Sequence, residues 1–311
     1  MVLGLVLRLD LVCSRIDTAE PVTQACSSWW FTALDWDVTL RWFGTLMRMA
    51  SASHLPTPPA ATPDETVDEI VAQSGRAAVP IRVAFLQEKE RGGGVRPGPL
   101  ADFVHSGDWR GLILYLLALT KASSEPWDTA LPASVWARAL GIELPQSNTA
   151  TSTISKAWKR IEDRRLVERS RRKRMAEIRL LCEDASGQPY THPGSSGTRH
   201  LKLPHSFWLD GPAGDRWFRV LDLPAVAVLL IALSQLDEFR MPFELGPDWY
   251  GISADTVNRG VHGLERHGLL RIDKGFKKAP LAPAGYTAEN RYTLQPPFGP
   301  RGARPAKAGQ P

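Results

Sequence analysis

Cysteine is scarce in this chain, with three residues in 311, and long apolar runs are absent from its sequence. Three cysteines cannot build a disulfide framework, so a reducing compartment is expected. No stretch reaches the roughly 18 consecutive apolar residues of a membrane span. Residues 1–13 are apolar, but Arg8 and Asp10 interrupt them and no basic segment precedes them, unlike a secretory signal peptide. We therefore expect a cytoplasmic protein with no membrane partner.

The sequence also lacks the spacings that metal and catalytic sites require. Cys182 stands alone, and no His or Cys pair has zinc-ligand spacing. Gly263 and Gly268 are spaced as in a phosphate-binding loop, but Leu269 stands where that loop needs lysine. Residues 194–197, Gly-Ser-Ser-Gly, depart from the serine-hydrolase pattern. No catalytic residue, metal or cofactor is predicted, and we expect that the chain is not an enzyme.

What the chain does contain is typical of a folded protein of two domains. Hydrophobic residues make up 43% and charged residues 23%, which is ordinary for a globular chain. Proline and glycine number 25 each, which indicates sizeable irregular segments. The net charge of +5 mildly favours an anionic partner.

The two ends of the chain look unlike its middle. The first fifty residues hold four of the eleven tryptophans without a helical pattern, and a Pro-rich polar run follows them. Residues 1–79 are therefore predicted to be a disordered or mis-annotated leader, with translation starting at Met47 or Met49; the alternative is an aromatic segment that binds a partner. Residues 80–108 are expected to form a strand and a loop. Residues 296–311 carry three basic residues and no acids, and are expected to be a disordered basic tail.

An internal repeat is the most informative feature. Residues 153–167 align without a gap to residues 256–270, and the Gly-Ile pair at Gly141 matches the pair at Gly251. Further upstream, Leu-Leu-Ala-Leu-Thr at 116–120 matches Leu-Ile-Ala-Leu-Ser at 230–234. The same order of elements is therefore predicted twice.

Each copy begins with an apolar helix, at about 110–122 and about 223–236, which should be buried because it is apolar on nearly all sides. A short helix follows, at about 133–140 and about 243–250, and the glycine after it allows a sharp turn. A third, amphipathic helix comes next, with Ser253 as the expected N-cap in the second copy. Its buried face should carry every third or fourth residue: Ile154, Trp158 and Ile161 in the first copy, and Val257, Val261 and Leu264 in the second.

After each third helix the apolar period changes to two, which predicts a pair of strands at 167–181 and again at 270–278 with 290–294. A helix-turn-helix followed by a hairpin resembles the winged helix-turn-helix superfamily, over residues 109–183 and 221–295. The resemblance implies tandem winged helices in a mainly α fold with small β-hairpins (α+β), joined by a linker at 184–220 that contains a strand. The sequence is also loosely similar to plasmid and phage replication initiators and to bacterial transcriptional regulators.

Residues 151–179 hold eleven basic and four acidic residues, a net charge of +7, where a duplex would lie against a winged helix. On the equivalent stretch of the second copy the balance is +3. Exposed helix side chains would meet base edges, and cations of the hairpin would meet phosphates or the minor groove. The candidate DNA-binding residues are Ser152, Ser155, Lys156, Lys159, Arg171, Arg172, Lys173 and Arg174 in the first copy, and Asn258, Arg259, His262, Lys274, Lys277 and Lys278 in the second.

These features predict a sequence-specific protein that binds double-stranded DNA, associated with the nucleoid and acting as a transcriptional regulator. Two alternatives stay open. One is a replication initiator of plasmid or phage type. The other is a winged-helix module that binds a protein rather than DNA, and the less basic second copy could contact such a partner.

Overall fold

The computed structural model describes residues 59–299, apart from 90–93, 143–148, 173–174, 196 and 236. The chain divides into two units, Met1–Pro59 and Ala60–Pro311. The elements below all belong to the second unit. The aromatic segment, the two alternative start codons and residues 300–311 of the expected tail lie outside the described residues.

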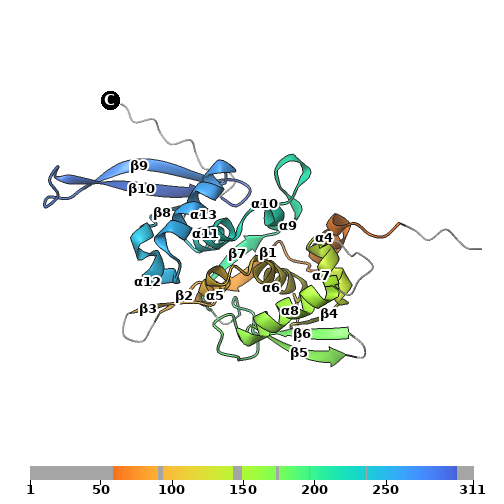
Figure 1. Ribbon diagram of the computed structural model, residues 1–311. Coiled ribbons are helices and arrows are strands. Elements are labelled where there is room, and N and C mark those ends of the chain that lie inside the picture. Colours follow the sequence, from red (N-terminus) through yellow and green to blue (C-terminus); the bar gives the residue numbers. More distant parts are fainter. Residues whose placement is uncertain are drawn as a thin grey trace, which may run out of the picture. The chain divides into compact units, whose positions relative to one another are not determined.

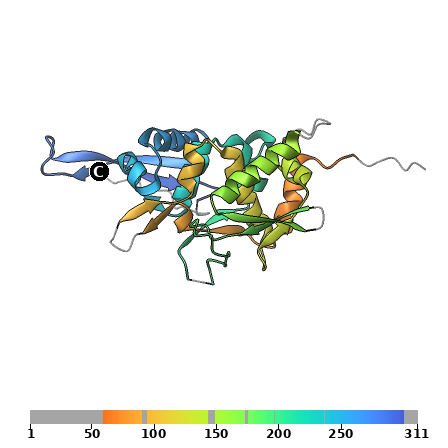
Figure 2. The same ribbon diagram turned by 60° about the horizontal axis from the view of Figure 1, so that its bottom comes forward.

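The described part of the chain combines helices with small antiparallel sheets (Figures 1 and 2). The expected combination of helices and small hairpins is confirmed at this level. Short 3-10 turns occur at Val83–Phe85, Pro212–Gly214 and Phe243–Leu245. The sheets pair β1 with β7, β2 with β3, β4 with β6 and β5, and β8 with β10 and β9.

The first repeat, residues 109–183, contains the helices that its sequence predicts. They are α6 (Trp109–Lys121), α7 (Ala133–Ala139) and α8 (Thr149–Asp163). In α6 every residue from Gly111 to Thr120 is buried. The strands β5 (Val167–Arg172) and β6 (Met175–Leu180) then form the expected hairpin.

The second repeat, residues 221–295, has the same order: α11 (Leu223–Leu233), α12 (Gly246–Tyr250), α13 (Ala254–Arg266), β9 (Leu270–Lys278) and β10 (Tyr286–Leu294). Ser253 caps α13 by accepting a hydrogen bond from the Thr256 N–H at 3.2 Å, as expected. The glycines of the expected sharp turns adopt the left-handed conformation, with φ of 67° at Gly141 and 64° at Gly251. The second strand of this hairpin begins four residues earlier than predicted, so the hairpin is longer.

Each repeat also holds a strand that the sequence analysis missed. The strands β4 (Asp128–Ala130) and β8 (Glu238–Phe239) lie between the first and second helices of their repeats. β4 pairs with β6, and β8 pairs with β10, so each hairpin becomes a three-stranded sheet. Strands of two or three residues are too short to show the alternation of apolar and polar residues from which a strand is predicted.

The prediction that residues 1–79 form a disordered leader is wrong for its last part. Within it lies the helix α4 (Pro63–Ala72), whose N-terminus is stabilised by a capping box between Thr62 and Glu65. Val67, Ile70 and Val71 of α4 join the hydrophobic core. A short helix with so few apolar residues gains its stability from packing rather than from propensity, which is why composition alone suggested disorder.

Residues 80–108 hold more structure than the expected strand and loop. The strand β1 (Ala78–Arg82) is followed by a hairpin of β2 (Gln87–Lys89) and β3 (Val95–Pro97), and then by α5 (Leu100–His105). Gly98 lies so close to the backbone that a Cβ would stand 2.4 Å from the Ala84 carbonyl oxygen. The sequence predicts a loop here because the stretch is rich in proline and glycine, although the segment is tightly packed.

The expected linker at 184–220 is also a folded segment. Its predicted strand exists as β7 (His200–Pro204), and it pairs antiparallel with β1, Ala78 opposite Pro204. The helices α9 (Ser206–Leu209) and α10 (Trp217–Val220) bury Phe207, Trp208 and Phe218. The sequence predicts a linker here because the strand of this segment pairs with β1, which lies far away in the sequence.

A buried ion pair anchors the same region. Glu183 is fully buried and pairs with Arg82 of β1, whose N–H it also accepts at 3.2 Å. Burial by itself disfavours the carboxylate and leaves the pKa of Glu183 above its usual value, although the Arg82 guanidinium opposes that rise. Arg82 also donates to the carbonyl and hydroxyl of Thr191.

Both repeats and the segments between them share one continuous hydrophobic core. That core includes Phe298, which is 7% exposed and packs near the rings of Phe207 and Trp217. The expectation of disorder is therefore wrong for residues 296–299. Among the described residues no helix has the length and hydrophobicity to cross a membrane.

Candidate nucleic-acid interface

The exposed face of α8 carries the predicted side chains Ser152, Ser155, Lys156 and Lys159, all of them exposed. The opposite face buries Ile154, Trp158 and Ile161, and the rings of Trp136 in α7 and Trp158 meet edge to face at 5.4 Å. This packing fixes which face of α8 meets solvent.

Two of these four polar side chains of α8 are engaged within the helix. The Ser155 hydroxyl donates to the Thr151 carbonyl at 2.9 Å, and Lys159 forms an ion pair with Asp163 one turn on. Lys156 has no ion-pair partner among the described residues. It is therefore the cation on this face that is most available to a ligand.

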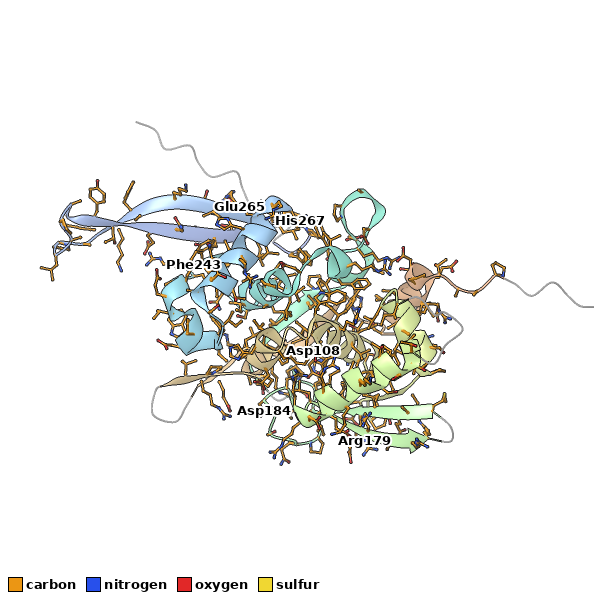
Figure 3. The ribbon with its side chains drawn as sticks, in the orientation of Figure 1. Asp108, Arg179, Asp184, Phe243, Glu265 and His267 are labelled. Carbon is orange, nitrogen blue, oxygen red and sulfur yellow. The ribbon has the colours of Figure 1, made fainter. Side chains whose placement is uncertain are left out.

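Two further arginines, Arg160 of α8 and Arg164 just after the end of that helix, are held by a buried carboxylate. Asp108, only 7% exposed, caps α6 by accepting the Gly111 N–H at 3.0 Å. Arg160 donates to Asp108, which is labelled in Figure 3, at 2.6 and 2.8 Å, and Arg164 donates to it at 3.0 Å. Arg164 also covers the Phe103 ring at 4.3 Å. The charge of +7 counted from the sequence thus overstates what this face offers to an anion.

The electrostatics of Asp108 follow from this clamp. Burial favours its neutral acid, but hydrogen bonds from Arg160 and from the Gly111 N–H, with the charges of Arg160 and Arg164, outweigh burial. The pKa of Asp108 therefore lies below its usual value. The carboxylate stays ionised and holds both arginines.

The hairpin of the first repeat exposes Arg171 and Arg172. Arg172 lies 3.5 Å from a Glu177 carboxylate oxygen, whereas Arg171 has no carboxylate partner among the described residues. Lys173 and Arg174 lie at the turn, outside those residues. Of the sequence-predicted cations in this hairpin, Arg171 is thus the one seen exposed and unpaired.

On α13 the structure brings the three predicted side chains together along one groove of about 570 Å³. Arg259 is paired with Asp255 at 3.3 Å and His262 with Glu265 at 3.0 Å, both exposed. Asn258 is half-buried. The sequence analysis missed three other polar residues of this groove, because they come from a different turn or a different helix: Asp222, Arg266 and His267.

Asp222 occupies the same place in the second repeat as Asp108 does in the first. Asp222 caps α11 by accepting the Ala225 N–H at 3.0 Å, just as Asp108 caps α6. The alignment of the repeats puts Gly263 where the first repeat has Arg160, and His267 where it has Arg164. No ion pair reaches Asp222 among the described residues. The capping carboxylate of the second repeat therefore lacks the two arginine partners that Asp108 has in the first.

The hairpin of β9 and β10 carries Lys274, Lys277 and Lys278, all exposed. None of them has an ion-pair partner in the part of the chain that the structure describes. The sequence from 274 to 288 contains these three lysines and no acid. The charge of these three lysines therefore stays uncompensated among the described residues, unlike much of the charge on α8.

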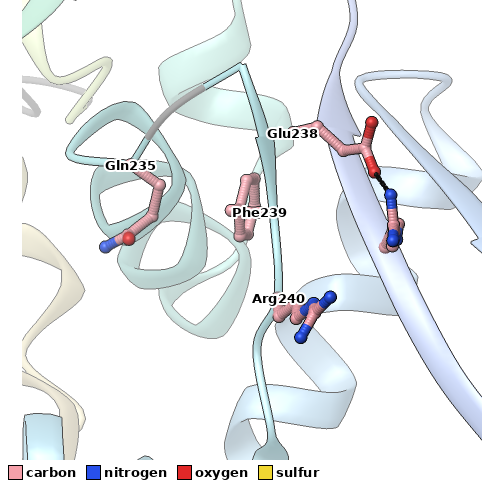
Figure 4. Close-up of a pocket in the computed structure, with 5 residues that line it drawn as sticks. Gln235, Glu238, Phe239 and Arg240 are labelled. Atoms are coloured by element: carbon pink, nitrogen blue, oxygen red, sulfur yellow. Dashed lines mark hydrogen bonds and ion pairs between the residues drawn. The ribbon is translucent and has the colours of Figure 1, made fainter. Parts of the chain in front are cut away.

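At the base of the same hairpin the charges are paired. A shallow pocket of about 450 Å³ is lined by Gln235, Glu238, Phe239, Arg240 and Arg291 (Figure 4). Arg291 donates to Glu238 at 2.6 Å, and Arg240 lies 3.0 Å from Glu289. These pairs neutralise the pocket.

Within the described residues, no three His, Cys, Asp or Glu side chains gather as metal ligands do. Cys182 is half-buried, and burial raises the pKa of its thiol, which disfavours the reactive thiolate.

Comparison with protein-family models, with curated proteins and with solved structures finds no match to this chain.

Proposed function

We propose that this chain binds double-stranded DNA in a sequence-specific manner, as a transcriptional regulator does, with each repeat acting as a winged helix-turn-helix unit. In support, each repeat has a buried helix, a short strand, a short helix, a glycine turn, an amphipathic helix and a hairpin that pairs with the short strand. In such units the third helix enters the major groove and the hairpin follows the backbone or the minor groove.

The observation that carries the proposal is the set of unpaired lysines on the second hairpin. Most other exposed cations near the two third helices have a carboxylate within 4 Å, whereas Lys274, Lys277 and Lys278 have none among the described residues. Phosphates are the partners that such a row of cations favours, because their contact releases condensed counterions from DNA.

The third helices supply groups that can contact base edges. Asn258 matches the donor and acceptor pair of adenine, and Arg259 matches guanine. Arg259 is held by an exposed i, i+4 ion pair, which is weak and easily exchanged for a base. In the first repeat, Lys156 has no ion-pair partner among the described residues and can likewise contact a base.

The test is the salt dependence of binding to a pool of random-sequence duplexes. The triple variant Lys274→Ala, Lys277→Ala, Lys278→Ala should weaken binding and flatten the slope of log K against log salt by up to about three. The matched control removes three cations elsewhere, Arg96→Ala, Lys121→Ala and Lys202→Ala, and should leave the slope nearly unchanged.

Equal effects of the two triple variants would mean that only net charge matters, which contradicts a hairpin contact. No binding of wild type to duplex DNA, or an affinity that does not depend on salt, would contradict the proposed contact with phosphates, because that contact releases counterions and an apolar protein interface does not. Such an outcome would favour the protein-interaction module instead.

A further inference from the structure

The tip of the β9–β10 hairpin exposes apolar side chains that a chain in isolation has no reason to expose. Leu281 is 102% exposed, Phe276 is 76% exposed and Tyr286 is 51% exposed. They are three of the four large hydrophobic residues that are exposed in the described part of the chain. The hairpin extends past α12 and α13 in both views (Figures 1 and 2).

The loop that presents Leu281 is held in one shape. The Ala279 N–H donates to the Gly285 carbonyl at 2.9 Å, and two successive tight turns are closed by Ala282 N–H to Ala279 O and by Gly285 N–H to Ala282 O. Pro280 and Pro283 occupy the second position of each turn, where a fixed φ is favourable. Leu281 is therefore pre-organised, so that little conformational entropy is lost when it meets a ligand.

The two aromatic rings form a second feature on one face of the arm. The register pairs Phe276 with Ala288 and Tyr286 with Lys278, so both rings lie on the same side, and they meet edge to face at 5.0 Å. At its base this side of the sheet carries Ile272 and Tyr292, which pack with the core. The apolar side of the hairpin thus continues beyond the body, with Lys274 and Lys278 beside the rings.

The charge of the hairpin and the small side chains at its tip indicate which ligand it binds. The absence of acids between 274 and 288 favours a polyanion, and a second copy of the chain would bring the same positive charge to a tip-to-tip contact. The residues around Leu281 are small: Ala279, Ala282, Ala284 and Gly285. A loop with small side chains beside Leu281 is compatible with the minor groove of B-DNA, which is about 6 Å wide.

We propose that the β9–β10 hairpin enters the minor groove and that Leu281 inserts between two base pairs, so that the duplex kinks, while Phe276 and Tyr286 pack on the sugars beside the step. This inference rests on the proposed binding of double-stranded DNA. Apolar wedges of this kind unstack a step and bend DNA by roughly 20–90° toward the major groove.

The experiment uses the full chain and a duplex of about 30 base pairs of alternating A·T sequence, whose TA steps unstack easily. Dyes on the two ends report bending by energy transfer. A second duplex carries one central T·T mismatch, which lowers the cost of unstacking. Wild type should raise energy transfer and should bind the mismatched duplex roughly tenfold more tightly than the paired one.

Leu281→Ala should abolish most of the rise in energy transfer and bring the ratio of the two affinities close to one, while the lysines keep their contribution to binding. The matched control is Leu209→Ala, which removes the fourth exposed apolar side chain, 42% exposed in α9. It should behave like wild type. Both changes are at exposed positions, so neither should affect folding much.

Binding without bending, or equal bending by wild type and Leu281→Ala, would refute the wedge and leave the proposed DNA binding intact. No binding by wild type to either duplex would overturn both. If sedimentation shows that wild type self-associates and Leu281→Ala does not, or if wild type prefers anionic phosphatidylserine vesicles to DNA, the tip serves another occupant and the wedge is refuted.

Discussion

Replacing Asp108 by alanine tests the clamp between α6 and α8. The change removes the N-cap of α6, which costs about 1 kcal/mol in the free energy of unfolding. It also leaves Arg164, whose side chain is 12% exposed, without its carboxylate. Loss of one partner from a buried pair costs about 3–5 kcal/mol, but Arg160 is 44% exposed and will be hydrated. We therefore expect a total loss of about 3 kcal/mol.

The second repeat supplies a matched control. Asp222→Ala removes the equivalent cap of α11, but no ion pair reaches Asp222 in the described residues. This change should cost only about 1 kcal/mol. Denaturant unfolding, with equal m-values required for the comparison, measures both variants. Equal losses would refute the assignment of Arg160 and Arg164 to the fold, and would return both arginines to the candidate interface.

The same clamp predicts a dependence on pH. Because the pKa of Asp108 is lowered in the folded state, its contribution to stability is complete above its ordinary value near 3.9. The contribution is lost as the pH falls through the lower, folded-state pKa. The unfolding free energy of Asp108→Asn should therefore change less than that of wild type over this acidic window, and parallel curves would contradict the prediction.

Four further changes test the packing and the interface. Gly260→Ala would bring a Cβ to 2.4 Å from the Pro224 carbonyl oxygen and should cost about 1–3 kcal/mol by denaturant unfolding, whereas Gly263→Ala, at 3.1 Å from a methyl group, should be near neutral or stabilising. Removing residues 60–79 should lower the melting temperature strongly, because α4 contributes to the core; an unchanged melt would contradict that role. Asn258→Ala should relax the base preference found by selection from random duplexes at one part of the site, and an unchanged preference would mean that Asn258 contacts no base.

The local elements of both repeats could be predicted because local patterns dictate them. An almost wholly apolar run such as 223–233 has to be buried, and the three- and four-residue spacing of Val257, Val261 and Leu264 fixes one face of a helix. Gly251 and Ser253 mark a turn and a helix start through their own backbone and side-chain chemistry. The alignment of one repeat on the other added the common order of elements.

Tertiary structure decided what depends on partners distant in sequence. Residues 128–130 become a strand only because β6 lies beside them, and β1 and β7 pair across more than a hundred residues. The positive charge of Arg160 suits a DNA-binding residue, yet its side chain forms an ion pair with the buried carboxylate of Asp108. Conversely, the apolar side chain of Leu281 would suit a hydrophobic core, but the hairpin leaves it fully exposed. Charge and hydrophobicity are properties of a residue, whereas pairing and exposure depend on what the fold brings next to it.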